Sequence, residues 1–334
     1  MNQPLMRPMR KLLSSHIVMR MMSTSRRQLK ALLMVADELH VGRAAERLGV
    51  TQPSLSRQIA AIEKDLGMPL FSRARRRFAL TPAGEIVVAG ARELLRRGDE
   101  VVRDAKRAHA GEIGSVRLGF VQSATYEVIP RLISAFRAAY PDVVVNARAM
   151  TTLEQSEALR TGHLDAGLVR PVTALHGLTT RVISRDPLVA ALPATHRLAR
   201  YEGVPLAALA DESFVLYFRD SAPVVHDTII GCCLAAGFSP RIVQEAQVQT
   251  IPALVAAGLG VSLLISPTPP HNPSQVVYRP IQDDLPLWDM ALAWSASNQS
   301  PTLARFLAVT EDGSPHGDER RRRVRHHAWV GRTW

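Results

Sequence analysis

The chain has 334 residues, of which 46% are hydrophobic and 21% are charged, and its formal net charge is +11. This composition excludes a disordered chain and provides for two or three domains with hydrophobic cores. The adjacent Cys232 and Cys233 exclude a disulfide framework and the spacing of a zinc site, and they indicate a reducing cytoplasm.

The positive charge lies mainly near the N-terminus. Residues 25–80 hold eleven Lys and Arg against five Asp and Glu, a net charge of +6, whereas residues 115–310 carry a net charge of −1. A small basic module with this charge predicts an anionic partner. Residues 1–22 are too polar for a signal peptide, and we expect a disordered extension or a start codon placed too far upstream. The longest nearly apolar run, residues 254–265, is only about half the roughly 20 residues of a membrane helix, so no membrane partner is expected.

Two helices separated by a tight corner are predicted within residues 43–67. The first ends at Gly49, a residue typical of helix C-termini, and the second has Pro53 in its first turn. An apolar stripe from Leu55 to Leu66 marks the buried face of the second helix. This is a helix-turn-helix pattern, in which the second helix enters the DNA major groove by its N-terminal end.

The start of the second helix is rich in side chains that form hydrogen bonds. Gln and Arg can make bidentate contacts with base edges, and small hydroxyls can reach bases or phosphates. Thr51 or Ser54 could instead be a plain N-cap, and Arg57 a solvated surface charge, but the whole set favours DNA. The predicted DNA contacts around this helix are Arg43, Thr51, Gln52, Pro53, Ser54, Ser56, Arg57 and Gln58.

A short hairpin is predicted directly after the second helix. Basic and apolar residues alternate along it, as expected for a wing that lies along the phosphate backbone. The wing residues predicted to contact phosphates are Arg73, Arg75 and Arg76.

The segment RAAERLGVTQPSLSRQIAAIEKDLGMPLFSRARRRFALTPAG, from Arg43 to Gly84, resembles the LysR-type transcriptional regulators. The similarity continues through VRLGFV, LRTGHLDAGLVR and LVAAGLGVSLL to about residue 310. One departure is Leu32, where the family commonly has Phe in its first helix. The resemblance implies a cytoplasmic regulator that binds double-stranded DNA, has RNA polymerase as a further partner, needs no cofactor and is not an enzyme.

A long helix is predicted from Pro82 onward. Val87, Leu94 and Val101 recur every seven residues, and the charges along the segment balance. Such a repeat favours a dimerising helix, although an ordinary amphipathic helix packed on its own domain would show a similar pattern. The resemblance implies that this linker pairs two subunits, and that the protein is a homodimer or a homotetramer.

Strand-like and helix-like segments alternate from Ser115 onward, which predicts an α/β domain with a largely parallel sheet. The resemblance implies two subdomains like those of periplasmic solute-binding proteins, with a small molecule between them. The whole chain is therefore predicted to be an α+β multidomain protein. Its predicted parts are an extension (1–22), a winged helix-turn-helix (23–82), a linker helix (83–112), an effector-binding domain (113–310; subdomain I 113–187 and 286–310, subdomain II 188–285) and a basic tail (311–334).

Candidate effector contacts lie where strands are followed by helices, because ligands of open α/β sheets bind there. Hydroxyls and helix N–H groups at such junctions suit the carboxylate of a small organic acid. Thr151 could be only the start of a capping box with Glu154, and Arg170 could pair with a neighbouring acid rather than with a ligand. By resemblance to the branch of the family that senses aromatic acids, Ser123 and Thr152 align with effector contacts. The predicted effector residues are Ser123, Thr151, Thr152, Arg170, Val225 and Thr250.

Other protein classes fit the sequence less well. No common catalytic motif occurs, and the eleven His residues have no metal-ligand spacing, although a catalytic trio can be brought together only by the fold. A non-specific architectural DNA-binding protein without an effector would not need a sensor of this size. A secreted solute-binding protein would have to be exported, and it would have no use for a helix-turn-helix. Two alternatives stay open: a non-specific or architectural DNA-binding protein without an effector and, with less support, an uncharacterised enzyme fused to a DNA-binding module.

Overall fold

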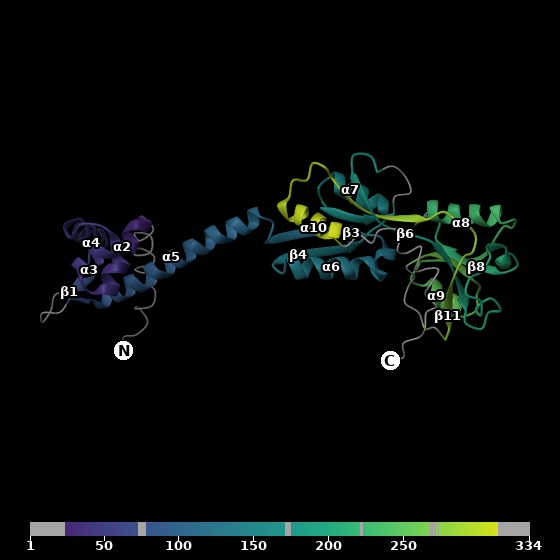
Figure 1. The fold of residues 1–334 in the computed structure, drawn as a ribbon, viewed down its shortest axis with the longest axis horizontal. Helices are drawn as coiled ribbons and strands as arrows, with labels where there is room; N and C mark the ends of the chain where they lie inside the picture. The colour runs from purple at the N-terminus through teal and green to yellow at the C-terminus, as the bar shows by residue number, and fades with distance from the viewer. Residues whose placement is uncertain are drawn as a thin grey trace, which may run out of the picture. The chain divides into compact units, whose positions relative to one another are not determined.

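The computed structural model describes residues 24–72, 78–170, 175–220, 223–266, 272 and 274–312 (Figure 1). The chain forms two compact units, one up to Lys106 and one from Arg107 onward, here called unit 1 and unit 2. The predicted N-terminal extension, the wing residues Arg73, Arg75 and Arg76, and the predicted tail beyond residue 312 lie outside the described residues.

The described residues of unit 1 form three short helices followed by a small hairpin and the first part of a long helix. Ser25 and Gln28 form a capping box that begins the first helix. Gly49 and Gly67 end the second and third helices in the left-handed conformation, with φ of 64° and 70°. The elements are α2 (Arg26–Glu38), α3 (Val41–Leu48), α4 (Gln52–Leu66), β1 (Phe71–Ser72), β2 (Ala79–Leu80) and α5 (Pro82–His109).

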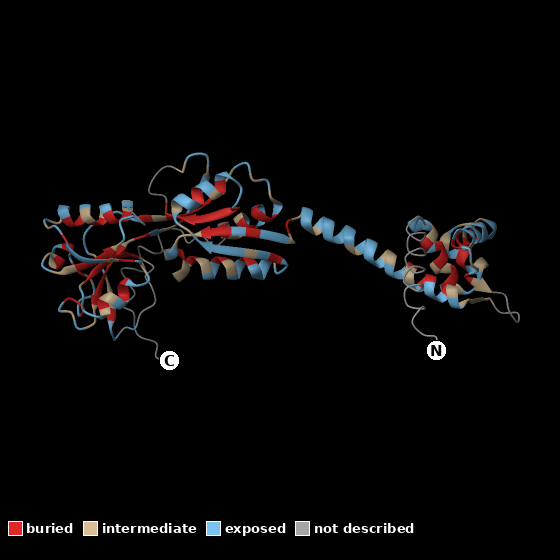
Figure 2. Cartoon of the chain, turned by 180° about the vertical axis from the view of Figure 1, so that it is seen from behind, coloured by how far each residue is buried: buried red, intermediate tan, exposed pale blue. Residues whose placement is uncertain are grey.

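The core of unit 1 collects the apolar stripes of its helices. The stripe predicted for the second helix of the motif, from Leu55 to Leu66, is buried along α4. Leu32 is fully buried in the same core, so leucine fills the position where the family commonly has phenylalanine. Figure 2 shows this core as the buried part of unit 1, with the outer faces of its helices exposed.

The two ends of α5 differ in their environment. Val87 and Ala91 are buried in the core of unit 1, and Leu94 packs against that core. Val101 and Val102, further along α5, are 63% and 51% exposed. Val87, the first residue of the predicted dimer interface, is 2% exposed and packs within its own unit.

Unit 2 contains a five-stranded sheet in the order β4-β3-β5-β12-β6. Strands β3, β4 and β5 are parallel, whereas β12 is antiparallel to both β5 and β6. Strands β3, β4, β5 and β6 therefore run in one direction, as expected for a largely parallel sheet, and β12, which enters the sheet after the second subdomain, runs against them. The strands are β3 (Gly114–Phe120), β4 (Val143–Ala149), β5 (Ala166–Val169), β6 (Thr179–Asp186) and β12 (Trp288–Trp294).

Helices cover both faces of this sheet. Side chains of α6 and α10 share one hydrophobic cluster with Leu118 and Leu168, whereas Leu159 of α7 packs with Val169 on the other face. The predicted helix after β3 is divided into a short 3₁₀ turn and a later α-helix. The elements are η2 (Gln122–Tyr126), α6 (Val128–Ala139), α7 (Thr152–Arg160) and α10 (Pro301–Asp312).

The second subdomain of unit 2 has a different sheet arrangement. Strand β7 lies between β10 and β11 and is antiparallel to both, while β8 and β9 form a separate parallel pair. The sequence made no prediction for the direction of these strands. Its elements are β7 (Leu188–Pro193), η3 (Leu206–Leu209), β8 (Ser213–Tyr217), α8 (Pro223–Ala235), β9 (Arg241–Ala246), α9 (Ile251–Ala256), β10 (Ser262–Ile265) and β11 (Val276–Pro280).

The two cysteines lie in the core of the second subdomain. Both belong to α8 and are buried among apolar side chains. Burial raises the pKa of both thiols, to about 12 for Cys233, so they pack as small apolar residues. Across the described ranges, no helix combines the length and the hydropathy that crossing a bilayer requires.

Candidate functional site

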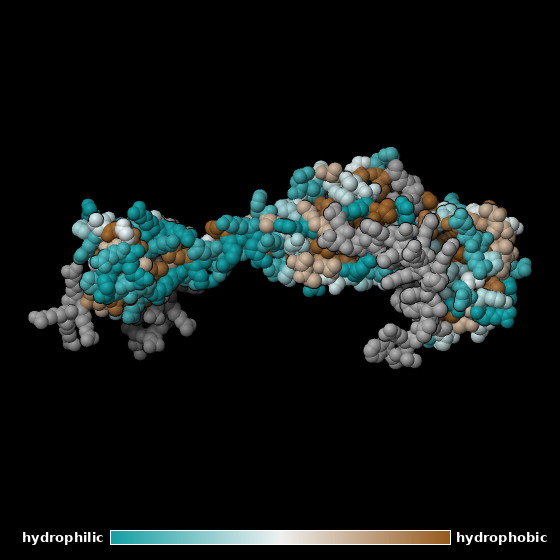
Figure 3. Space-filling model, viewed as in Figure 1, coloured by the Kyte–Doolittle hydropathy of each residue, from teal (hydrophilic) through white to brown (hydrophobic). Residues whose placement is uncertain are grey.

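The N-terminal end of α4 presents polar side chains at the surface. Thr51 occupies the N-cap position, yet its side chain makes no capping hydrogen bond to the described turns of α4. Gln52, Ser56 and Arg57 are exposed, and Ser54 is half-buried. The hydroxyl of Thr51 is therefore not used as a plain cap, and these groups can approach an external partner. Figure 3 shows unit 1 with a mostly hydrophilic surface.

Arg43 belongs to an ion-pair network beside the helix-turn-helix. Its Nε lies 3.1 Å from Oε2 of Glu38, at the end of α2, and Arg47 pairs with the same carboxylate. Hydrogen bonds from Arg47 and then Arg43 hold the pKa of Glu38 below its ordinary value. Both guanidinium groups stay more than half exposed, so the pair orients them without removing them from solvent.

The base of the wing hairpin is tied to the recognition helix α4. Oε1 of Glu63 accepts hydrogen bonds from the backbone N–H groups of Leu70, at 2.7 Å, and Phe71, at 3.1 Å. On the other side, Thr81 donates to the carbonyl of Pro69 at 2.8 Å. A Cβ at Gly84 would lie 2.0 Å from the carbonyl oxygen of Leu70, so only glycine allows this close approach. The sequence did not single out Glu63, although an acid near the end of α4 is visible in it.

Replacing Glu63 with alanine should weaken binding to specific and random duplexes alike, by about tenfold, because two charge-assisted hydrogen bonds that position the wing are lost. Fluorescence anisotropy with both duplexes would measure this loss. Glu46→Ala removes the same charge from an exposed position of α3 and is the control. If Glu63→Ala binds both duplexes as tightly as Glu46→Ala, Glu63 does not position the wing.

In unit 2, Arg170 connects the ends of several strands of the first sheet. It follows β5, and its Nη2 lies 3.0 Å from Oδ2 of Asp186 at the end of β6. Its Nε donates to Oγ of Ser123 at 3.1 Å, and its Nη1 donates to the carbonyl of Trp288 at 3.4 Å. The side chains of Arg170 and Asp186 are 7% and 0% exposed. Arg170 thus pairs with a neighbouring acid, which was the alternative to direct contact with a ligand.

Further polar groups surround this ion pair. Oγ1 of Thr152, at the start of α7, donates to the carbonyl of Arg170 at 3.4 Å. The hydroxyl of Tyr126 and Nε1 of Trp288 are buried and have no hydrogen-bond partner in the described part of the chain. Burial raises the pKa of Tyr217 to about 12, and its hydroxyl accepts a hydrogen bond from the backbone of Ile265 at 3.2 Å. We call Ser123, Tyr126, Thr152, Arg170, Asp186, Tyr217 and Trp288 the junction cluster.

Of the six predicted effector residues, the structure brings Ser123, Thr152 and Arg170 together. Thr151 instead forms a complete capping box with Glu154, the alternative foreseen for it, so its hydroxyl is used inside α7. Val225 is 8% exposed and packs in the core of the second subdomain, and its role as an effector contact stays a prediction. Thr250 is exposed at the N-cap position of α9 and makes no side-chain capping bond to the described helix.

Asp186, Tyr126, Tyr217 and Trp288 were not among the predicted site residues. Tyr217 ends strand β8, so the strand-end criterion used for Ser123 could have found it. Nothing in the sequence pairs Asp186 with Arg170, because the two residues become neighbours only when β5 and β6 flank β12. Within the described ranges, no group of three or more His, Cys, Asp and Glu side chains could hold a metal ion.

Two family descriptions match the chain along most of its length. Residues 26–85 match the bacterial regulatory helix-turn-helix proteins of the lysR family, and residues 109–314 match the LysR substrate binding domain. The chain belongs to the LysR family of transcriptional regulators. A LysR-type regulator joins an N-terminal winged helix-turn-helix that binds DNA to an effector-binding domain, and the described residues show the same two parts.

Individual LysR relatives cover nearly the same span. The regulator IlvR of Caulobacter vibrioides is 40% identical over 295 residues, which are 86% of this chain and 98% of that protein. The uncharacterized regulator YnfL of Escherichia coli is 37% identical over 290 residues, again 86% and 98% of the two chains. The crystal structure of full-length CbnR with its target DNA has a TM-score of 0.76 at 26% identity, over 87% of this chain and all of that one.

Proposed function

We propose that this LysR-type regulator changes its action on DNA when a small organic acid, of the aromatic class, binds at the junction cluster. Residues 23–82 then bind the operator, residues 83–112 pair two subunits, and residues 113–310 sense the acid. The regulator acts in the cytoplasm, and the acid leaves it chemically unchanged.

The single observation that carries the effector assignment is the junction cluster itself. Two buried donors, the Tyr126 hydroxyl and Nε1 of Trp288, have no partner among the described residues. An unpaired buried donor costs about 1 to 3 kcal/mol, so a ligand that accepts from these groups would recover this free energy. Carboxylate oxygens are strong acceptors, and the ring of Tyr126 suits a flat apolar body, whereas the ring of Trp288 packs in the core of the second subdomain.

Arg170 takes a positioning role in this proposal. Its guanidinium is already satisfied by Asp186, by Ser123 and by the carbonyl of Trp288. The bond from Nε to Oγ of Ser123 leaves the hydroxyl hydrogen of Ser123 available to a ligand oxygen. Ser123 therefore donates to the acid, while Arg170 fixes the direction of Ser123 and supplies a nearby positive charge. Thr152 donates to the acid only by turning its hydroxyl hydrogen away from the 3.4 Å contact with the carbonyl of Arg170.

DNA recognition is assigned to the polar start of α4 together with the wing. Gln52 and Ser56 are exposed on α4, and Arg43 is held beside it by Glu38. Gln52 and Ser56 read base edges in the major groove, and the wing arginines contact phosphates. CbnR was solved with its target DNA, which supports the same mode of binding for this chain.

The ligand controls DNA binding only through a difference in its affinity for two arrangements of the assembly. Two segments connect the two subdomains, one between β6 and β7 and one between β11 and β12. Asp186 and Trp288 of the junction cluster lie at these connections. A ligand that contacts both subdomains there stabilises one arrangement of the two halves. In a homodimer or homotetramer, the favoured arrangement of the two halves changes the positions of the linker helices and of the DNA-binding domains attached to them.

Calorimetry of the full chain against benzoate-like and aliphatic acids tests the effector assignment. Ser123→Ala and Thr152→Ala should each lower the affinity for the aromatic acid several-fold, since a neutral hydrogen bond contributes about 0.5 to 1.5 kcal/mol. DNA binding without acid should stay unchanged in both variants.

Thr180→Ala is the matched control, because Thr180 is exposed near the start of β6, at the opposite end of that strand from Asp186. Its affinity for the acid should equal that of the unmodified chain. Equal acid binding by all three variants would remove Ser123 and Thr152 from the site. Binding of only a neutral or cationic metabolite would refute the acid class.

A further inference from the structure

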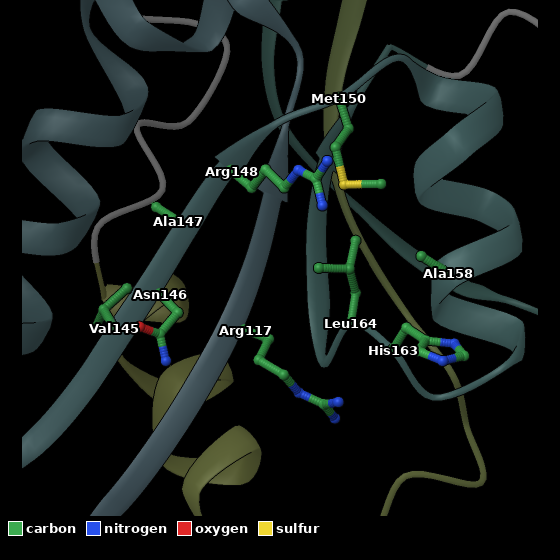
Figure 4. Close-up of a pocket in the computed structure, with 9 residues that line it drawn as sticks. All are labelled: Arg117, Val145, Asn146, Ala147, Arg148, Met150, Ala158, His163 and Leu164. Atoms are coloured by element: carbon green, nitrogen blue, oxygen red, sulfur yellow. The ribbon is translucent and has the colours of Figure 1, made fainter.

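A hollow of unit 2 lies away from the junction cluster, over the edge strand β4. It has a volume of about 510 Å³ and is lined by residues of β3, β4, α7 and the loop that follows α7. Figure 4 shows Leu164 in its centre, with Arg148 and Arg117 on opposite sides and His163 beside α7. The hollow lies on the face of the sheet that α7 partly covers, because Leu118 and Phe120 of β3 point to the other face.

Strand register explains why this surface is hollow and basic. In the parallel pair of β3 and β4, Arg117 lies beside Asn146 and Gly119 lies beside Arg148. Gly119 has no side chain, and a Cβ there would meet Cδ1 of Leu164 at 2.7 Å. The side chain of Leu164 therefore packs directly on the sheet over Gly119 and forms the apolar floor of the hollow. Arg148 lies beside it on the edge strand β4.

The charged groups around the floor have different partners. Arg117 is fixed by Asp165, with Nε at 3.0 Å and Nη2 at 2.7 Å from its two carboxylate oxygens. Burial alone would raise the pKa of Asp165, but the hydrogen bonds from Arg117 outweigh it and lower the pKa. Nδ1 of His163 is 2.9 Å from Oγ1 of Thr161, which orients the ring. Arg148 has no hydrogen bond or ion pair with any described residue, and it helps to lower the pKa of Glu154.

We propose that this hollow binds a small organic anion with a short hydrocarbon part. Arg148 holds the oxyanion group, with Asn146 and His163 as further donors, because a guanidinium without a partner matches carboxylate and phosphate oxygens. The hydrocarbon part lies on Leu164 and Ala158. A carboxylate and a phosphomonoester share this chemistry, so the test includes both.

This site is separate from the junction cluster, although both touch α7. Thr152, in the junction cluster, is the first residue of α7, whereas Ala158 lies near its opposite end and His163 in the loop beyond that end. A ligand in the hollow contacts α7 from its C-terminal end and thereby gives the regulator a second point of chemical control. The proposal does not depend on the aromatic-acid assignment, because no residue of the junction cluster lines the hollow.

Calorimetry of the full chain with hexanoate, butyl phosphate and inorganic phosphate tests the proposal. Hexanoate or butyl phosphate should bind with a Kd below about 10 mM, and inorganic phosphate more weakly because it lacks the hydrocarbon part. Arg148→Gln should lower the affinity for the bound probe at least about tenfold, because a charge-assisted hydrogen bond is lost. Ala158→Met keeps every charge but narrows the hollow, so it should also lower the affinity for the probe.

Two variants separate this site from its alternatives. Arg131→Gln removes an equal charge from the exposed surface of α6, on the other face of the sheet, and should leave binding unchanged. Thr152→Ala should also leave it unchanged. Equal affinity in Arg148→Gln and Arg131→Gln would overturn the proposal, as would a loss seen only in Thr152→Ala, which would place the probe at the junction cluster. Failure of every probe to bind the unmodified chain would overturn it too.

Discussion

Replacing Asp186 with alanine is expected to lower the free energy of unfolding of the effector-binding domain by about 3 to 5 kcal/mol, because an unpaired charge would remain buried. Arg170 is the charge in question, with a side chain that is only 7% exposed. Its other partners, Ser123 and the carbonyl of Trp288, are neutral and cannot replace the carboxylate. Urea unfolding followed by tryptophan fluorescence measures the change, since Trp288 and Trp294 lie in β12 of this domain.

An exposed Arg–Asp pair in the same unit provides the control. Arg219 and Asp227 are joined by two hydrogen bonds of 2.8 Å, but their side chains are 60% and 50% exposed. Asp227→Ala should therefore change stability little, because solvent screens such pairs. A double Arg170→Met, Asp186→Leu variant should recover much of the stability lost in Asp186→Ala. If Asp186→Ala is as stable as Asp227→Ala, the ion pair does not hold the strand ends together.

Replacing Val101 with aspartate is expected to dissociate the subunits. Val101 is 63% exposed on α5, so the change should leave the isolated subunit folded. In a paired linker, each subunit would bury one unpaired carboxylate, at a cost of several kcal/mol. Sedimentation of the full chain at micromolar concentration measures the assembly, and the affinity for DNA with two half-sites should fall far more than the affinity for one half-site.

Ala89→Asp is the control for this variant. Ala89 is an exposed residue of the same helix that lies outside the seven-residue repeat of Val87, Leu94 and Val101. It introduces the same charge, and the assembly should keep its size. A Val101→Asp variant that sediments like Ala89→Asp would show that the linker does not pair subunits through this position.

Local patterns in the sequence predicted the DNA-binding unit well because its elements are specified by nearby residues. The stripe from Leu55 to Leu66 has helical spacing, and Gly49 and Gly67 mark helix ends that the structure places in the left-handed region. Thr51 was less predictable. Whether its hydroxyl caps α4 depends on side-chain geometry that residue type alone does not determine.

The junction cluster was only partly predictable, because its contacts join distant segments. Ser123 and Thr152 were found since both follow strands, which is a local feature. Asp186 becomes the partner of Arg170 because β12 lies between β5 and β6 in the sheet. The spacing of apolar residues along the sequence does not predict this order of strands. The sequence makes no prediction for the antiparallel order around β7, since short apolar strands look alike in parallel and antiparallel sheets.

Footprinting of the full chain on duplexes selected from a random pool, with and without aromatic carboxylates, tests the central claim most directly. The account predicts a protected site with two half-sites, which one aromatic acid changes in the unmodified chain and changes much less in Thr152→Ala. Gln52→Ala should lose the preference for that site while keeping binding to random DNA, as a bidentate base contact provides about 1 to 3 kcal/mol of discrimination. Protection without sequence preference, or a footprint that no acid alters, would contradict the account.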